Sequence, residues 1–146
     1  MITYKKGNLL ATEDSVIIHG CNARGVMGAG VALQIKLKYP KAFTDYERFC
    51  KQRANPLGLV CISTQPDYKV IINAITQSGY SNENTRHVSY DAVDDCMVRI
   101  GQYSEPQTRI SIPKIGAGLG GGDWKVIEAI INHRLSEFNI TVWELP

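Results

Sequence analysis

The sequence predicts an α/β fold, in which a mixed but mostly parallel sheet of about six strands lies between two layers of helices. Two observations predict it. Short runs rich in apolar and β-branched residues alternate along the chain with segments whose apolar residues recur at helical spacing. Parallel strands are joined by crossover connections and are buried on both faces, so this alternation favours helices above and below one sheet. The length of 146 residues suits one domain with a single core, over residues 1–146.

The first half of the chain predicts four strands and two helices. VIIHGC is an apolar, β-branched run typical of a buried strand. In the first helix Val31, Ile35 and Tyr39 fall on one face, together with Ala32, as in an amphipathic helix. A proline is well tolerated in a first helical turn and begins the second helix. The expected strands are residues 2–5, 16–21, 57–64 and 68–76, and the expected helices run from about 29 to 39 and from Pro40 to about 50.

The second half alternates helices with strands. Val88, Ala92, Cys96 and Ile100 are four residues apart, which predicts a helix. Asp123 stands at the N-cap position of a strong helical pattern. The expected helices are residues 87–102 and 124–138, the expected strands are 109–113 and 140–145, and residues 77–86 are polar and read as a loop.

Composition excludes several classes of protein. The net charge of +2 is too small to imply a nucleic-acid or membrane surface. There is no signal-peptide pattern, and no apolar run approaches the roughly 20 residues of a membrane span. The spacing of the four cysteines, Cys21, Cys50, Cys61 and Cys96, fits neither a CxxC pair nor a common zinc site. We therefore expect reduced thiols, no metal, and a monomeric cytoplasmic protein.

Two glycine-rich loops are the main functional signal. GVMGAG (25–30) and GAGLGGG (116–122) each follow an apolar strand and lead into a helix. Ligands of α/β sheets bind at the carboxyl ends of strands, and backbone N–H groups at a helix start face anions. Two such loops can hold the two sides of a diphosphate. The alternative is that the glycines only make tight turns. The second loop also fits GxGxxG, but one helix and one strand are too little for a Rossmann unit, and neither loop has the GK[ST] of a P-loop.

The chain resembles the macrodomain family, whose members bind ADP-ribose. The resemblance rests on KGNLL, on VIIHGCNARGVMGAGVALQIKLKYPKAFTDY and on IPKIGAGLGGGDW, and it covers nearly the whole chain. It is greatest to the branch of ADP-ribose-1″-phosphate phosphatases and single-domain ADP-ribosyl hydrolases, and HGCN looks most like the phosphatase type. The resemblance implies a three-layer α/β/α macrodomain that removes the terminal phosphate of ADP-ribose-1″-phosphate without a cofactor. The alternatives are a hydrolase of ADP-ribose attached to protein or nucleic acid, and a non-catalytic ADP-ribose reader.

The resemblance also implies where the ligand lies. Asn8 stands where macrodomains usually have an Asp that accepts a hydrogen bond from the adenine amino group, and Leu9 would offer its backbone N–H to the base. Asn22 matches the Asn that contacts the distal ribose. The diphosphate would lie between two sets of residues, Gly28, Ala29, Gly30 and Val31 in the first loop and Ile115, Gly116, Ala117, Gly118, Leu119, Gly120 and Gly121 in the second.

Four residues are candidates for the chemistry. His19 would act as general acid and base, with Asn22 positioning the distal ribose. The alternative for His19 is a packed histidine whose ring nitrogens are satisfied within the protein. Asp91 is a candidate acid partner, or simply a favourable charge in a first helical turn. Asp123 is a displaced acid or the N-cap of the last helix. His87 is assigned no role.

The chain also departs from the family at two positions. The hydrolases that act on ADP-ribosylated glutamate use a Lys and an Asp, and those places hold Gln77 and Gly120, which makes a Lys-adduct mechanism unavailable there. Arg24 either pairs with a terminal phosphate or is exposed. Cys21 is a nucleophile or, as is commoner, a small buried hydrophobe. Tyr80 is expected to cover the distal site.

Overall fold

The computed structural model describes residues 2–79, 87–118 and 120–145. It confirms the predicted alternation of strands and helices and adds a short 3₁₀ turn, η1. Two residues of the predicted ligand site, Tyr80 and Leu119, lie outside the described residues. The strands are β1 (Ile2–Lys6), β2 (Val16–Asn22), β3 (Val60–Thr64), β4 (Val70–Gln77), β5 (Arg109–Ile112) and β6 (Asn139–Glu144); the helical elements are η1 (Leu9–Ala11), α1 (Gly30–Lys38), α2 (Pro40–Lys51), α3 (Tyr90–Tyr103) and α4 (Trp124–Arg134).

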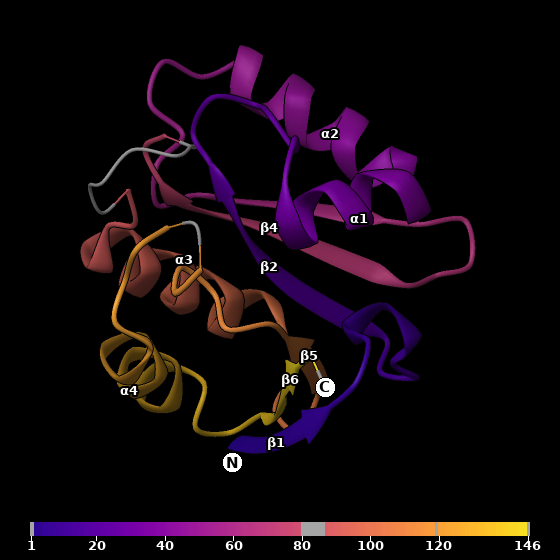
Figure 1. The fold of residues 1–146 in the computed structure, drawn as a ribbon, viewed down its shortest axis with the longest axis vertical. Helices are drawn as coiled ribbons and strands as arrows, with labels where there is room; N and C mark the ends of the chain where they lie inside the picture. Colours follow the sequence, from indigo (N-terminus) through magenta and orange to yellow (C-terminus); the bar gives the residue numbers. More distant parts are fainter. Residues whose placement is uncertain (1, 80–86, 119, 146) are drawn as a thin grey trace.

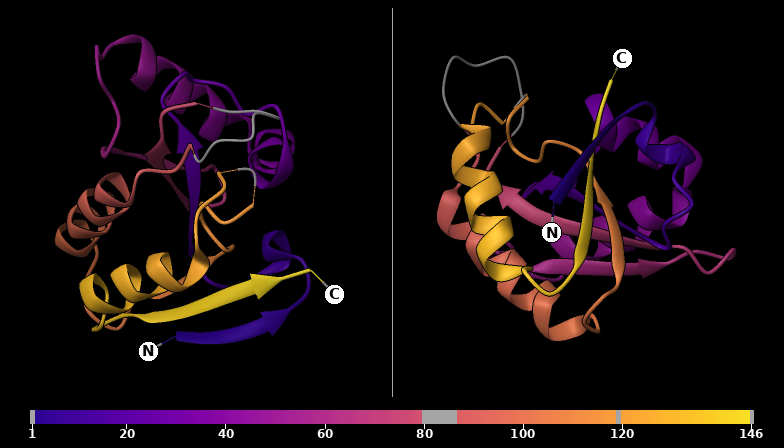
Figure 2. Two further views of the ribbon diagram at one scale, coloured as in Figure 1. Left: turned by 60° about the vertical axis from the view of Figure 1, so that its left-hand side comes forward. Right: turned by 90° about the horizontal axis from the view of Figure 1, so that it is seen from below.

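The six strands form one mixed sheet in the order β1-β6-β5-β2-β4-β3. Only the β3–β4 pair is antiparallel, so the predicted mostly parallel sheet is confirmed. β1 and β6 lie side by side at one edge, which brings the beginning and the end of the chain together (Figure 2). Because β2, β4 and β5 are parallel, their carboxyl ends meet at the same edge of the sheet, where ligands bind in α/β folds.

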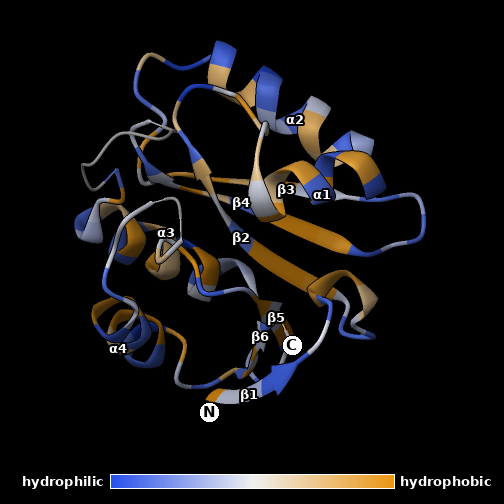
Figure 3. Ribbon diagram, viewed as in Figure 1, coloured by the Kyte–Doolittle hydropathy of each residue, from blue (hydrophilic) through white to orange (hydrophobic). Residues whose placement is uncertain are grey.

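Helices cover both faces of the sheet, with α1 and α2 on one side and α3 and α4 on the other (Figure 1). Strand alternation divides the core between these layers. Ile17 and Ile71 are paired neighbours that pack with Ile35 of α1, whereas Ile18 and its partner Ile72 pack in the cluster under α3 and α4. β2 and β4 are therefore apolar on both faces, and Figure 3 colours much of both ribbons as hydrophobic. Burying each of these isoleucines contributes about 2 kcal/mol.

Two predicted elements are shorter in the structure than in the sequence pattern. The strand expected over 57–64 begins only at Val60, because Gly58 has a φ of +87° and makes a turn instead. The helix expected over 124–138 ends at Arg134. The apolar residues beyond it are still buried, so the periodicity continued after the helix had ended.

Two further expectations concern helix starts. The helix expected from residue 87 begins at Tyr90, where the Ser89 hydroxyl accepts a hydrogen bond from the Ala92 amide at 3.1 Å and acts as N-cap. Val31 was expected on the core face of α1 but is 38% exposed, because the first turn of α1 faces a cleft and not the sheet. In the described part of the chain, no helix is long and apolar enough to cross a membrane.

Candidate active site

A cleft of about 630 Å³ lies across the carboxyl ends of β5, β2 and β4, between the two glycine-rich loops. This volume suits a ligand of nucleotide size. Most of the predicted ligand-site residues line it. They are His19, Asn22, Gly28, Ala29, Gly30, Val31, Ile115, Gly116, Gly118 and Gly120, whereas Asn8, Leu9, Asp91, Ala117, Gly121 and Asp123 are not among the lining residues.

The first glycine-rich loop is held by the side chain of Asn22. Its Oδ1 accepts hydrogen bonds from the amides of Arg24 (3.0 Å) and Val26 (3.3 Å) and from the Tyr46 hydroxyl (2.8 Å). Its Nδ2 donates to the Val26 carbonyl at 2.8 Å. Asn22 is therefore the brace of this loop, with its acceptor fully used and one amide hydrogen left for a ligand.

The start of α1 opens into the cleft. Ala29 is its N-cap and offers no side-chain acceptor, so the first backbone N–H groups of the helix are not capped. Gly28, Ala29 and Gly30 are exposed and line the cleft at this point. Uncapped amides at a helix start, together with the helix dipole, form a binding site for an anion such as a diphosphate.

The second glycine-rich loop is held by close backbone packing. Gly116 has a φ of +74°, and a Cβ there would lie 2.7 Å from Val88 Cγ2 and 3.0 Å from Ile127 Cδ1. Its carbonyl accepts a hydrogen bond from the Gly122 amide at 2.8 Å. A Cβ on Gly120 would lie 2.8 Å from the Gly116 carbonyl oxygen. Gly116 is thus required by φ as well as by space, and Gly120 by space.

His19 is sealed beneath the cleft. It is 1% exposed, and its Nε2 lies 2.6 Å from Oδ1 of Asn73, the residue paired with it on β4. The Asn73 amide nitrogen donates to the Cys61 carbonyl at 3.2 Å, which turns Oδ1 toward His19 as an acceptor. Burial lowers the pKa of His19 to about 4, opposed in part by the hydrogen bond to Asn73. This geometry fits the packed, neutral histidine that the sequence left as the alternative.

Cys21 lies on the same face of β2 as His19, as strand alternation predicts. Its Sγ is 3.5 Å from His19 Nε2. Burial raises the pKa of the Cys21 thiol well above its ordinary value, which disfavours the thiolate that a nucleophile needs. Cys21, Cys50, Cys61 and Cys96 are all free in the structure.

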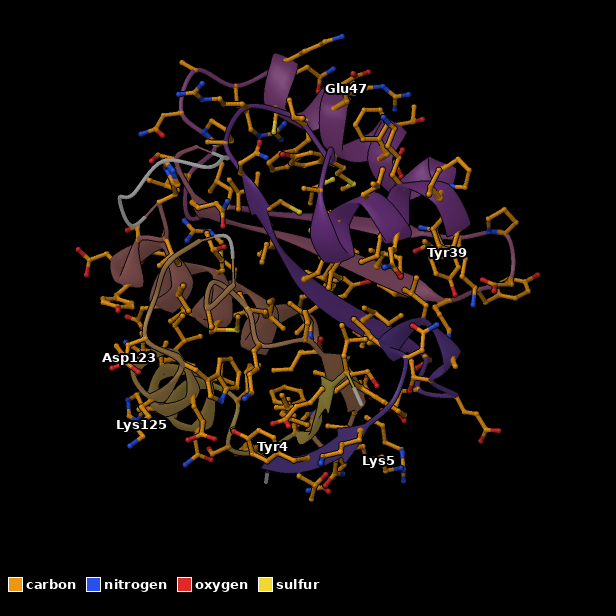
Figure 4. The ribbon with its side chains drawn as sticks, in the orientation of Figure 1. Tyr4, Lys5, Tyr39, Glu47, Asp123 and Lys125 are labelled. Carbon is orange, nitrogen blue, oxygen red and sulfur yellow. The ribbon has the colours of Figure 1, made fainter. Side chains whose placement is uncertain are left out.

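The two candidate carboxylates lie away from the cleft. Asp123 is exposed at the start of α4, beside Lys125 (Figure 4), and its carboxylate accepts a hydrogen bond from the Lys125 amide at 2.9 Å. The N-cap prediction for Asp123 is thus confirmed. Asp91 is exposed in the first turn of α3. Among the described residues no Asp or Glu lines the cleft, and none of them form a group of three or more His, Cys, Asp or Glu able to hold a metal ion.

One end of the cleft points toward Asn8. At that end Lys114 Nζ lies 3.2 Å from a carboxylate oxygen of Glu144, whose carbonyl accepts a hydrogen bond from the Gly7 amide. Asn8 itself is exposed and caps η1, accepting from the backbone N–H two residues later at 3.0 Å. Leu9 is buried. Asn8 thus already uses its acceptor on the backbone, and a base would share that oxygen or use its amide.

The opposite end of the cleft is formed by Gln77, the last residue of β4. Its Nε2 donates to the Gly79 carbonyl at 2.8 Å, and its Oε1 would lie 2.9 Å from a Cβ on Gly120. From the sequence, Gln77 stood out only as a departure from the family pattern. A usable signal existed, since Gln77 directly follows the strand expected over 68–76, at the edge of the sheet where the loops meet.

Arg24 and His87 lie next to this end. A Cβ on Gly79 would lie 3.2 Å from His87 Nδ1 and 3.8 Å from Arg24 Nη2. The His87 amide donates to the Gly120 carbonyl at 2.9 Å, which ties it to the second loop. Its Nε2 is buried and has no hydrogen-bond partner among the described residues. Nothing in the sequence signalled this position, because it depends on the close approach of three loops.

The sequence model of the family described as Macro domain matches residues 18–131. The chain is 27% identical over 143 residues to an ADP-ribose 1″-phosphate phosphatase of Candida albicans, covering 90% of this chain and 92% of that protein. It is 33% identical over 132 residues to a DNA ADP-ribosyl glycohydrolase of Mycobacterium tuberculosis, covering 88% of this chain but 37% of that protein. The fold is similar to the macrodomain of Mycobacterium tuberculosis DarG, with a TM-score of 0.82 and 28% identity over 98% of this chain and 97% of that one.

Proposed function

This chain belongs to the macrodomain family, and from that premise we propose that its cleft binds ADP-ribose and that the protein removes the terminal phosphate of ADP-ribose-1″-phosphate. One observation carries the proposal. The uncapped start of α1 and the glycine backbone of the second loop face each other across a cleft of about 630 Å³. A diphosphate between them would accept hydrogen bonds from backbone amides, and no carboxylate of the described residues lines the cleft to repel it.

The proposed direction of the ligand follows from the two ends of the cleft. The adenosine points toward Lys114 and Asn8, and the distal ribose points toward Gln77. Asn22 would contact this ribose through its remaining amide hydrogen. Because His19 is buried and its Nε2 faces Asn73, we assign it a structural role and not proton transfer.

Phosphate release is favoured by the likeness to the Candida albicans phosphatase over nearly the whole of both chains. The likeness to the Mycobacterium tuberculosis glycohydrolase supports a second candidate, removal of ADP-ribose from DNA. The residues at the distal end weigh against a lysine adduct, because Gln77 and Gly120 offer no amine and no carboxylate. Water is then the nucleophile that either candidate requires.

The test uses a variant that strengthens the fold while blocking the proposed anion site. Ala29→Asp supplies the missing N-cap of α1, which stabilises such a helix by about 1 kcal/mol. Its carboxylate would occupy the amides that we assign to the diphosphate. We expect Ala29→Asp to keep or raise the Tm and to weaken ADP-ribose binding at least about tenfold by calorimetry, since like charges repel.

Asp123→Ala is the matched control, because it removes an N-cap outside the cleft. We expect a lower Tm with unchanged ADP-ribose affinity and unchanged phosphate release from ADP-ribose-1″-phosphate. Loss of turnover in Asp123→Ala would restore Asp123 as a catalytic acid. Wild-type protein that binds ADP-ribose without releasing phosphate, but frees ADP-ribose from modified DNA, would establish the second candidate. Binding without either reaction would leave a reader, and no binding would overturn the proposal.

A further inference from the structure

The polar side chains that line the cleft differ in the hydrogen-bonding capacity that remains for a ligand. His19 and Cys21 are buried and face each other beneath the cleft floor. Asn22 Oδ1 already accepts three hydrogen bonds. Lys114 is paired with a carboxylate at the adenosine end. Among the described lining residues, the side-chain acceptor left over is Oε1 of Gln77.

The orientation of this acceptor is fixed by the protein. Gln77 Nε2 donates to the Gly79 carbonyl at 2.8 Å, so a flipped amide would bring two oxygens together. The Gln77 backbone is fixed as well, because its carbonyl accepts from the Ala23 amide at 2.8 Å. Oε1 therefore lies against Gly120, which also lines the cleft, at a distance of 2.9 Å from the position of an added Cβ. A hydrogen-bond acceptor held in one place suits a group that donates, such as a water molecule or a hydroxyl.

A guanidinium lies near Gly79, the residue that Gln77 bonds to, but outside the residues that line the cleft. Arg24 approaches Gly79 from the first loop, with Nη2 3.8 Å from the position of an added Cβ. A neutral acceptor is a poor contact for a phosphate dianion, whereas a guanidinium is a good one. A phosphate on the distal ribose would therefore not contact Oε1 directly, and Gln77 would face a water molecule next to it.

We propose that Gln77 is a catalytic residue of this cleft, whose Oε1 accepts a hydrogen bond from the water that attacks the phosphorus of ADP-ribose-1″-phosphate. The inference rests on the function proposed above. The water oxygen forms the new bond to phosphorus while the bond from phosphorus to the anomeric oxygen breaks. One water proton reaches the anomeric oxygen by way of a phosphate oxygen, and the other stays on the phosphate. The products are ADP-ribose and inorganic phosphate. An uncharged amide orients the water and takes no proton, as glutamines that position water in phosphoryl transfer do.

The test compares Gln77→Met with Ser78→Ala. Met keeps the length of the side chain but removes both its acceptor and the Nε2 donor to the Gly79 carbonyl, and Ser78 is an exposed neighbour outside the cleft. We expect Gln77→Met to lower kcat for phosphate release about 100-fold, the scale of one oriented hydrogen bond in a transition state. KM and the Kd for ADP-ribose should change little, and the Tm should fall only by the loss of the one hydrogen bond to the Gly79 carbonyl. The fall should be the same at every pH, since an amide does not titrate. Ser78→Ala should behave as wild type.

The outcomes separate this inference from the proposed function. Equal kcat in wild type and Gln77→Met would overturn the inference and leave the phosphatase intact. A joint fall of kcat, ADP-ribose affinity and Tm would also overturn it, because Gln77 would then be structural. Wild-type protein that binds ADP-ribose but releases no phosphate would overturn the phosphatase proposal, and the role of Gln77 with it.

Discussion

The two glycine-rich loops face the same cleft but are held in opposite ways. The first loop is braced by one side chain, since Asn22 bonds to the backbone on either side of the turn and to Tyr46 of α2. The second loop is held by close packing that only glycine allows, with the backbone of Gly116 against Val88 and Ile127.

The difference predicts which change breaks each loop. The first loop has room at Gly28, where the nearest atom to an added Cβ is 3.6 Å away, although the positive φ of Gly25 and Gly30 disfavours a side chain at those two positions. It should fail when atoms are removed from its brace. The second loop should fail when atoms are added, except at Gly118, where an added Cβ would meet nothing within 4 Å. Two glycine-rich loops that look alike in sequence are therefore stabilised differently, the first by side-chain hydrogen bonds and the second by close backbone packing.

The largest expected effect is that of Gly116→Ala. A positive φ costs a non-glycine residue about 1 to 2 kcal/mol, and overpacking against Val88 adds about 1 to 3 kcal/mol. We expect a loss of about 3 to 4 kcal/mol in the free energy of unfolding by urea titration. Gly118→Ala is the matched control and should stay within about 0.5 kcal/mol of wild type. Equal stability of the two variants would contradict the packing that distinguishes this loop.

Asn22→Ala should have the next largest effect. It leaves the Val26 carbonyl and the amides of Arg24 and Val26 without the side chain that bonds to them, at a cost of about 2 to 3 kcal/mol, while the Tyr46 hydroxyl keeps the backbone carbonyl of residue 22 as an acceptor. Tyr46→Phe removes one bond of the brace and should cost about 1 kcal/mol. Protease cleavage in the first loop, measured alongside urea unfolding, should rise more for Asn22→Ala than for Tyr46→Phe. If both variants resisted cleavage as well as wild type does, the loop would have another brace.

The smallest expected effect concerns pH and the histidine beneath the first loop. The folded pKa of His19, about 4, lies below the ordinary value of 6.5, so the unfolded chain takes up the proton first as the pH falls. The stability that His19 contributes is present above pH 6.5 and is lost as the pH falls toward 4. Between pH 7 and pH 5 this loss is about 2 kcal/mol.

The measurement is urea unfolding at both pH values for wild type and His19→Gln. The pH dependence should be smaller in His19→Gln by that amount, while His133→Gln, an exposed site in the last turn of α4, should match wild type. A proton NMR titration of the His19 ring in the wild type measures its pKa in the folded protein directly. A His19 ring that titrates near pH 6.5 would return it to the list of possible general bases.

Much of the fold was predictable because the elements depend on patterns of residues that are close together in the sequence. Apolar runs and helical spacing predicted the strands and helices, and the placement of both loops after strands predicted a cleft at the carboxyl edge of the sheet. The N-cap of Asp123 was predictable for the same reason, since capping involves residues one turn apart. The ends of the elements were less predictable, because α4 stops at Arg134 although its apolar spacing continues.

Which side chains reach the cleft was decided by tertiary structure alone. His19 is sealed because the register of β2 and β4 sets it beside Asn73, a residue 54 positions away in the chain. Gln77 faces the cleft because its amide is tied to Gly79 and the second loop folds against it. The sequence by itself determined the elements and the glycine positions, since these depend on neighbours along the chain. Burial, pKa and free hydrogen-bonding capacity depend on partners that only folding brings together.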